Sequence, residues 1–143
     1  MEKEREEAER LGYKDPIHAS KSETDEDYNS ALKFCIENIY NISICAGTHN
    51  ERSSLYLTEL MKDAGLRNND SRIYFAQLLG MSDHISFNLS KEGYNVAKYV
   101  PYGPIKEVLP YLIRRAEENT SVSGQTGREL LLIEKEIKRR KSR

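Results

Sequence analysis

Ile42-Ser43-Ile44-Cys45-Ala46-Gly47-Thr48-His49-Asn50 is the stretch that decides the fold class of this chain. Its first five residues have the length and the β-branched content of a short buried strand. The polar residues that follow can begin a helix, with Asn50 as its N-cap. A helical pattern then runs to Gly65, which suits the position just after a helix end. The apolar positions of this helix are Leu57, Leu60, Met61 and Ala64. The stretch therefore predicts a strand followed directly by a helix.

The same alternation recurs on both sides of this unit. Toward the C-terminus we predict a strand over 72–76, a helix over 82–91, a strand over 97–100 and a helix opened by Gly103 and Pro104. Toward the N-terminus, Thr24 or Asp25 is expected to cap a helix with one continuous apolar face, made of Tyr28, Ala31, Leu32, Cys35, Ile36 and Ile39. A charged helix over 1–11 and a basic-ended helix over 126–141 complete the pattern. Both cysteines, Cys35 and Cys45, are predicted to be small buried hydrophobes.

Repeated strand–helix units predict an α/β fold with a parallel sheet. The 143 residues correspond to a single domain in length, divided into a charged helix and loop (1–24), the βα units (25–119) and a basic C-terminal helix (120–143). Three short strands cannot close into a barrel, and both edges of such a sheet would be bare. The chain therefore resembles a slice of a larger α/β structure.

Composition and charge exclude several classes of protein. The 22 basic and 23 acidic residues give a formal net charge of −1, which argues against a nucleic-acid binder driven by overall charge. No run approaches the roughly 18 apolar residues of a spanning helix. The three histidines, His18, His49 and His84, are scattered without the spacing of a metal site. Neither a GxGxxG fingerprint nor a Walker segment is present, so nucleotide binding by those devices is excluded.

Polar residues follow the predicted strands, where ligands bind in parallel α/β folds. Thr48, His49 and Asn50 offer a hydroxyl, an imidazole and an amide next to a helix N-terminus, which suits a phosphate. The same three residues also fit an ordinary N-cap with a neighbouring histidine. Gln77 and Gly80 follow the second strand, where they can serve a tight turn and backbone hydrogen bonds.

A stripe of polar residues lies on one side of the helix that follows the third strand. Tyr111, Arg114, Arg115 and Glu118 fall at i, i+3, i+4 and i+7. Two adjacent guanidiniums can hold a carboxylate bidentately, although a solvated Arg–Glu ladder has the same pattern. Arg114 lies ten residues after Pro104, roughly 15 Å along a regular helix. The pair can therefore bind a ligand at the strand ends only if this helix crosses them.

Four motifs together resemble FAD-dependent proline dehydrogenases, particularly the eukaryotic mitochondrial type. They are GYKDPI (12–17), AGTHNE (46–51), AQLLGMSDHISF (76–87) and KYVPYGPIKEVLPYLIRRAEEN (98–119). The Tyr-Leu-x-Arg-Arg-x-x-Glu-Asn element within the last one is highly specific. The resemblance implies the C-terminal portion of a distorted (β/α)8 barrel, about its last three strands and helices. It also implies a final helix that crosses the barrel mouth.

The resemblance implies a role for each matching residue. Arg114 and Arg115 would clamp the carboxylate of proline, Tyr99 would pack on its ring and Leu78 would line the substrate pocket. Thr48, His49 and Asn50 would contact the phosphate and ribose region of FAD. Glu118 would assist on the flavin side or order Arg115. His18 and Lys21 would belong to the loop nearest the adenosine, and no catalytic residue is assigned within this chain.

The implied activity is oxidation of L-proline to 1-pyrroline-5-carboxylate, with electrons passed through FAD to a quinone. The implied location is the matrix side of the mitochondrial inner membrane, with peripheral membrane association and no nucleic-acid partner. The earlier strands of the family have no counterpart in this sequence, so we expect the chain to be inactive alone. Two alternatives stay open: a hydroxyproline dehydrogenase of the same family, and a non-catalytic binding module that uses Arg114 and Arg115 as an anion patch.

Overall fold

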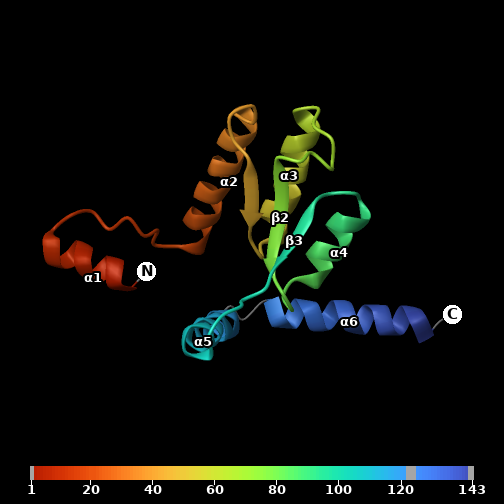
Figure 1. Cartoon of the computed structure of the whole chain (residues 1–143). Helices are drawn as coiled ribbons and strands as arrows, with labels where there is room; N and C mark the ends of the chain where they lie inside the picture. The colour runs from red at the N-terminus through yellow and green to blue at the C-terminus, as the bar shows by residue number, and fades with distance from the viewer. Residues whose placement is uncertain (1, 122–124, 142–143) are drawn as a thin grey trace.

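The computed structural model describes residues 2–121 and 125–141. Its elements are α1 (Glu2–Leu11), α2 (Lys21–Glu37), β1 (Ile44–Gly47), α3 (Glu51–Asp63), β2 (Ile73–Leu78), α4 (Asp83–Lys91), β3 (Val96–Tyr99), α5 (Ile105–Ser121) and α6 (Gln125–Lys141). Figure 1 shows α2, α3 and α4 gathered around the strands, with α1 set apart from the sheet. The predicted order of helices and strands is confirmed.

The three strands form one parallel sheet in the order β1-β2-β3. Each connection from one strand to the next contains a helix, as parallel pairing requires. The register places Gly47 beside Ala76, Ala76 beside Ala97, and Leu78 beside Tyr99. The predicted α/β class and the parallel sheet are therefore confirmed.

The two faces of the sheet have different surroundings. One face packs against α2, α3 and α4 in a continuous core with Leu57, Ile73 and Phe75 at its centre. The other face carries Cys45 and Tyr74, which pair with each other in the register and are exposed. The prediction that Cys45 is buried is wrong, because successive strand residues point to opposite faces and its neighbours Ile44 and Ala46 take the covered one.

Two of the predicted helix ends are confirmed by the structure, and one predicted N-cap is wrong. Asn50 caps α3 by accepting hydrogen bonds from the backbone N–H of Arg52 and Ser53. Gly65 follows the helix end with φ +67°, as expected for a C′ glycine. The cap of α2, however, is Ser20 and not Thr24 or Asp25. Ser20 and Glu23 form a reciprocal capping box, which moves the helix start four residues upstream of Thr24–Asp25.

The middle strand is longer than predicted. We placed Gln77 and Leu78 in the loop after a strand over 72–76, whereas β2 continues through Leu78. Pairing with β3 extends the ladder, and Leu79 N–H donates to the Tyr99 carbonyl at 2.9 Å. Leu78 is thus held by the sheet and not by a loop.

Helices α5 and α6 lie beyond the carboxyl ends of the strands (Figure 1). The apolar residues Ile105, Leu109, Leu112 and Ile113 on one side of α5 stay largely exposed, and Leu109 is 51% accessible. That side of α5 is therefore not part of the core formed by the described residues. None of the described helices combines the length and the hydropathy needed to cross a membrane.

Candidate functional site

A row of small residues crosses the exposed face of the sheet near the carboxyl ends of its strands. Gly47, Ala76 and Ala97 are consecutive neighbours in the register, one from each strand. A Cβ atom built on Gly47 would meet no atom of the described residues within 4 Å, so they leave the space above this glycine open. The three small side chains form a floor on this face of the sheet and leave room for a flat ligand beside Gly47.

An aromatic and cationic cluster lies beside this floor. The ring of Tyr99, at the end of β3, meets the ring of Tyr111 edge to face, with centroids 6.1 Å apart and planes at 84°. The guanidinium of Arg115 lies over the Tyr111 ring at 5.3 Å from its centroid. The middle of α5 therefore returns to the end of β3, and this removes the geometric difficulty posed by the distance of Arg114 and Arg115 from Pro104.

The other predicted substrate residues lie around the same cluster. Leu78 pairs directly with Tyr99 in the sheet, on the same face as the small-residue row. Arg114 is exposed on α5, one residue before the half-buried Arg115. Glu118 lies on the same helix, but its side chain falls outside the described residues. The structure thus brings Leu78, Tyr99 and Arg115 to one end of the sheet.

Thr48 and Asn50 have structural hydrogen bonds. The Thr48 hydroxyl accepts from the Asn50 backbone N–H at 3.0 Å, and the Asn50 side-chain oxygen caps α3. These contacts support the interpretation of Thr48 and Asn50 as part of an ordinary N-cap of α3. They also shape the turn that places His49 between the end of β1 and the N-terminus of α3.

His49 takes part in a contact that the sequence did not indicate. Its Nδ1 lies 2.9 Å from the hydroxyl of Ser82, which is 33 residues further along the chain. Ser86 and Gln77 continue this buried polar group, and the Ser86 hydroxyl donates to the Gln77 side-chain oxygen at 2.8 Å. Serine residues at these positions carry no sequence signal, so only the packing of α4 against β2 shows the group.

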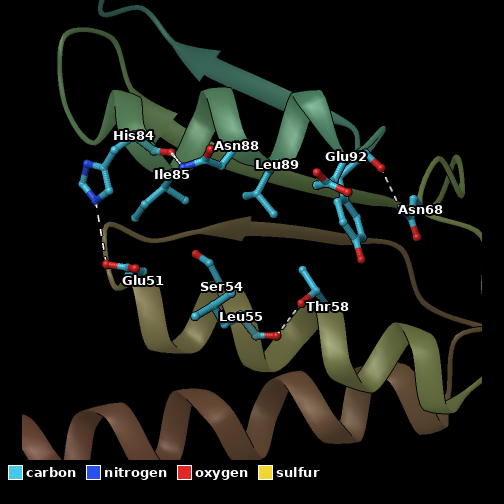
Figure 2. A pocket seen from close by; sticks show the side chains of 11 residues that line it. Glu51, Ser54, Leu55, Thr58, Asn68, His84, Ile85, Asn88, Leu89 and Glu92 are labelled. Atoms are coloured by element: carbon cyan, nitrogen blue, oxygen red, sulfur yellow. Dashed lines mark hydrogen bonds and ion pairs between the residues drawn. The ribbon is translucent and has the colours of Figure 1, made fainter. Parts of the chain in front are cut away.

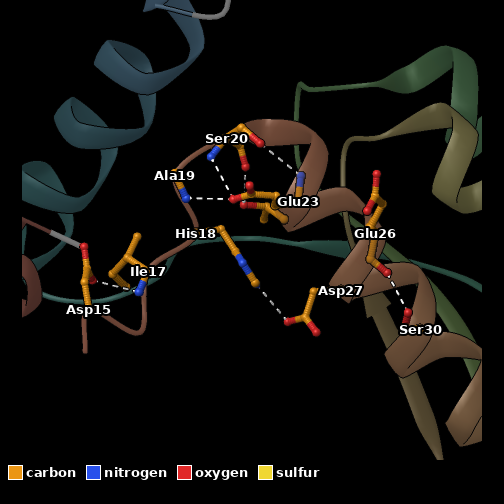
Figure 3. A network of polar contacts seen from close by, with 10 residues as sticks. Asp15, Ile17, His18, Ala19, Ser20, Glu23, Glu26, Asp27 and Ser30 are labelled. Atoms are coloured by element: carbon orange, nitrogen blue, oxygen red, sulfur yellow. Dashed lines mark hydrogen bonds and ion pairs between the residues drawn. The ribbon is translucent and has the colours of Figure 1, made fainter. Parts of the chain in front are cut away.

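His18 lies in a separate polar network near the start of α2 (Figure 3), and Lys21 is the first residue of that helix. His18 Nε2 is 3.2 Å from an Asp27 carboxylate oxygen, and Lys21 pairs with Asp25 one turn along the helix. The Arg5 guanidinium on α1 donates to the His18 carbonyl at 2.8 Å. These contacts tie α1 and its loop to α2.

A groove of about 280 Å³ runs between α3 and α4 (Figure 2). Ile85, Leu89 and Leu55 supply apolar surface, and Glu51 and His84 approach each other to 3.9 Å at one end. None of the site residues predicted from the sequence lines it. Within residues 2–121 and 125–141, no group of three or more His, Cys, Asp or Glu side chains could hold a metal ion.

Comparison with known proteins gives consistent matches along the chain. The family model described as proline dehydrogenase matches residues 1–128. The chain is 43% identical to proline dehydrogenase 1, mitochondrial, of Homo sapiens over 143 residues, covering 98% of this chain and 24% of that protein. It is 40% identical to the protein of the same name from Drosophila melanogaster, covering 98% of this chain and 22% of that protein.

A relative named for a different substrate and a solved structure also match. Hydroxyproline dehydrogenase of Xenopus laevis is 39% identical, covering 98% of this chain and 31% of that protein. The crystal structure of proline utilization A from Bdellovibrio bacteriovorus, inactivated by N-propargylglycine, has a TM-score of 0.75 and 30% identity. That match covers 85% of this chain and 12% of that protein. The chain thus spans about a quarter of the length of the curated relatives that it matches.

Proposed function

The chain belongs to the proline dehydrogenase family, and we propose that it supplies the last three strands and helices of a distorted (β/α)8 barrel that oxidises L-proline with FAD. The product is 1-pyrroline-5-carboxylate. The open face of the sheet supports this proposal, because in a barrel that face points inward and is covered by the remaining strands. Closing the barrel also pairs the two bare edges of the sheet, at β1 and β3.

The observation that carries the proposal is the cluster of Tyr99, Tyr111 and Arg115 beside the small-residue floor. Proline in neutral solution carries a carboxylate and an apolar ring. A guanidinium binds a carboxylate through two parallel hydrogen bonds, and a tyrosine ring packs against aliphatic carbon. Arg115 and Arg114 therefore anchor the carboxylate, and Tyr99 with Leu78 contacts the ring. Glu118, on the same helix, orders Arg115 or assists on the flavin side.

The residues near the floor fit FAD by their size and chemistry. Gly47, Ala76 and Ala97 leave room for a flat ring system against the sheet. His49, with the turn built by Thr48 and Asn50, stands at the N-terminus of α3, where anionic groups are favoured. We assign Thr48, His49 and Asn50 to the phosphate and ribose region of FAD. When bound, FAD supplies the acceptor for the hydride that leaves the substrate.

The protein's own contribution is to bind and orient the substrate. Holding the carboxylate at Arg115 and the ring at Tyr99 sets the position of the ring carbon that reacts, which converts an encounter of two molecules into a pre-arranged one. Tyr111 restrains both residues, Tyr99 through the edge-to-face ring contact and Arg115 through the cation–π contact. One aromatic residue thus fixes the distance between the two substrate contacts.

We further propose a quinone as electron acceptor and the matrix side of the mitochondrial inner membrane as the location, with peripheral association. The mitochondrial names of the relatives support the mitochondrion as the compartment. The net charge of −1 is consistent with the absence of a nucleic-acid partner.

A hydroxyproline dehydrogenase is the second candidate, favoured by the 39% identity to the Xenopus laevis relative. Tyr99 argues for proline, because at the proposed site its bulky ring would crowd a hydroxyl on the substrate ring. The non-catalytic alternative makes Arg114 and Arg115 a surface patch for an anion. That alternative leaves the contact between Tyr99 and Tyr111 without a role.

A chimera tests the proposal directly. Residues 1–143 replace the matching segment of the Homo sapiens relative, and the purified protein is examined for flavin absorbance and for proline-dependent reduction of a quinone analogue. We expect both signals. A folded chimera that lacks both would reject the proposal.

Gly47→Leu in the chimera provides the matched variant. A Cβ atom at Gly47 would meet no atom of the described residues within 4 Å, so we expect the substitution to leave folding intact while it fills the floor. We expect loss of bound flavin with an unchanged circular dichroism spectrum. Retention of the full flavin content would show that the floor is not the flavin site.

A further inference from the structure

Gln77 is a buried amide on the helix-facing side of β2. The residues of this strand that face the core are Ile73, Phe75 and Gln77, and Gln77 is 2% exposed. An apolar side chain would fill this position without removing an amide from water, a cost that only hydrogen bonds can offset. The hydrogen bonds of Gln77 therefore show what the amide does there.

The two ends of the Gln77 amide bond to different elements. Its Nε2 donates to the Thr48 carbonyl, directly after β1, at 3.4 Å. Its Oε1 accepts from the Ser86 hydroxyl on α4 at 2.8 Å, and Ser86 is also buried. One side chain on β2 thus joins α4 to the turn that follows β1.

The Thr48 carbonyl determines the direction of both bonds. A carbonyl only accepts hydrogen bonds, so the amide group that faces it is the NH2 group of Gln77. The amide oxygen then faces Ser86, and the serine hydroxyl donates its single proton to it. The Ser82 carbonyl lies farther from the same hydroxyl, at 3.3 Å. The hydrogen-bonded chain therefore runs from Ser86 through Gln77 to Thr48.

This chain of bonds fixes the turn that contains Thr48. The peptide between Thr48 and His49 is planar, so holding its carbonyl oxygen sets the orientation of the whole peptide plane. The Thr48 backbone N–H donates to the Ala76 carbonyl at 3.2 Å, so Thr48 is attached to β2 through both of its backbone groups. The turn continues to Asn50, whose backbone N–H donates to the Thr48 hydroxyl and whose side chain caps α3. Contacts within the protein thus set the position of residues 48–50.

We propose that Gln77 is a positioning residue for FAD: oriented by Ser86, its amide holds the Thr48 carbonyl and keeps the turn 48–50 in the conformation that binds the cofactor. A turn that is already ordered loses less conformational entropy when a ligand binds, so the ligand binds more tightly. This inference rests on the proposed function, which assigns Thr48, His49 and Asn50 to the phosphate and ribose region of FAD. It adds a residue that faces the core and acts only through the Thr48 carbonyl.

The first experiment measures the dissociation constant for FAD in the chimera with Gln77→Met. Methionine has a similar length but cannot donate to the Thr48 carbonyl. We expect the dissociation constant to rise about 3- to 10-fold, the effect of losing one neutral hydrogen bond. At saturating FAD the KM for proline should stay unchanged, because Gln77 and the substrate residue Leu78 point to opposite faces of β2. An unchanged dissociation constant for FAD would overturn the proposal.

Ile73→Val is the matched control for a loss of stability. Ile73 is fully buried on the same face of β2, at the end of the strand away from the turn. The control removes one methylene from the core, so thermal unfolding should occur at a lower temperature while FAD binding stays unchanged. If the control weakens FAD binding as much as Gln77→Met does, the effect comes from general destabilisation and the proposal fails.

Ser86→Ala tests whether Ser86 orients the amide, and it is a milder change should Gln77→Met fail to fold. We expect this variant to raise the dissociation constant for FAD about 3- to 5-fold, and to add nothing further once Gln77 is replaced by methionine. No change in Ser86→Ala, or additive effects in the double variant, would overturn the hydrogen-bonded chain.

The second experiment examines the turn without flavin. Hydrogen–deuterium exchange of the flavin-free chimera is followed by mass spectrometry in peptides that cover residues 48–54. We expect exchange about 3- to 10-fold faster in Gln77→Met and unchanged in Ile73→Val, because the bond to Thr48 opposes local opening of the turn. Equal exchange in the parent and in Gln77→Met would overturn the positioning role.

His49→Ala separates this inference from the proposed function. If His49→Ala weakens FAD binding and Gln77→Met does not, the positioning role alone is overturned. If neither variant weakens FAD binding, the assignment of the turn to FAD fails, and the inference about Gln77 fails with it. Weaker binding in both variants, with faster exchange in Gln77→Met, supports both.

Discussion

Arg115→Lys tests the substrate clamp while it keeps the positive charge. In the structure the Arg115 guanidinium lies 5.3 Å from the centroid of the Tyr111 ring, and that ring meets Tyr99 edge to face. A lysine at this position keeps one charge but has no planar fork, so it cannot bind a carboxylate bidentately and stack on Tyr111 at the same time. The substitution thus removes geometry and not charge.

The expected size of the effect follows from these contacts. One hydrogen bond between charged partners contributes about 1.5–3 kcal/mol, and a partly exposed cation–π contact contributes about 0.5–1 kcal/mol. Lysine retains part of the cation–π attraction, so we take the low end of the sum, about 2 kcal/mol. That corresponds to about a 30-fold loss in kcat/KM for proline, with the larger share in KM because the carboxylate is bound before and during the reaction.

The assay is steady-state kinetics of the chimera with proline and a quinone analogue. Arg67→Lys is the matched control, because Arg67 is exposed in the connection between α3 and β2, away from the carboxyl ends of the strands. We expect the control to match the parent within error. A KM for proline that stays unchanged in Arg115→Lys would refute the clamp and favour an anion patch with another purpose.

Three further predictions concern substrate choice, stability and completeness. Tyr99→Ser should shift the ratio of specificity constants toward hydroxyproline, because it removes the ring beside the pocket; an unmoved ratio would place Tyr99 outside it. The hydrogen bond from Arg72 lowers the pKa of Asp70 from 3.8 to about 2, so Asp70 stabilises the fold above pH 3.8 and loses this contribution as the pH falls through about 2. Since Arg72 is one-third exposed, we discount the contribution to about 1 kcal/mol, and urea unfolding of Asp70→Asn at pH 7 should show that loss, whereas an equal loss at pH 2 would contradict the origin. The 143-residue chain alone should contain no FAD and oxidise no proline, because its sheet has two open edges, and a flavin-loaded active monomer would disprove this.

The local features that the sequence predicted well depend on residues close together in the chain. The Asn50 cap and the Gly65 helix end were both confirmed, because each involves only the adjacent helical turn. The Ser20–Glu23 capping box was equally legible as a Ser-x-x-Glu pattern, and it was missed because Thr24 and Asp25 lie closer to the apolar face. That error was one of choice among local signals and not of missing information.

The errors in the strands have a different origin. The apolar run 42–46 indicates a strand but not which residues face the helices, and the side on which Cys45 lies depends on the register with β2. The end of β2 depends on its pairing with β3, since Leu78 extends the strand only opposite Tyr99. A pairing between segments some twenty residues apart is invisible to a local pattern.

Periodicity and caps predicted the α/β class and the parallel sheet from the amino-acid order alone, and the resemblance carried by the Tyr-Leu-x-Arg-Arg-x-x-Glu-Asn element indicated the family. The class and the sheet follow from which side chains recur at helical or strand spacing, and they need no knowledge of how the elements pack. Tertiary structure decided the rest: that Tyr111 on α5 meets Tyr99 on β3, that small residues form one floor, and that Ser82 reaches His49. Each of these contacts joins different elements, so its existence depends on how helices dock on the sheet, which is a property of the whole fold and of no single segment.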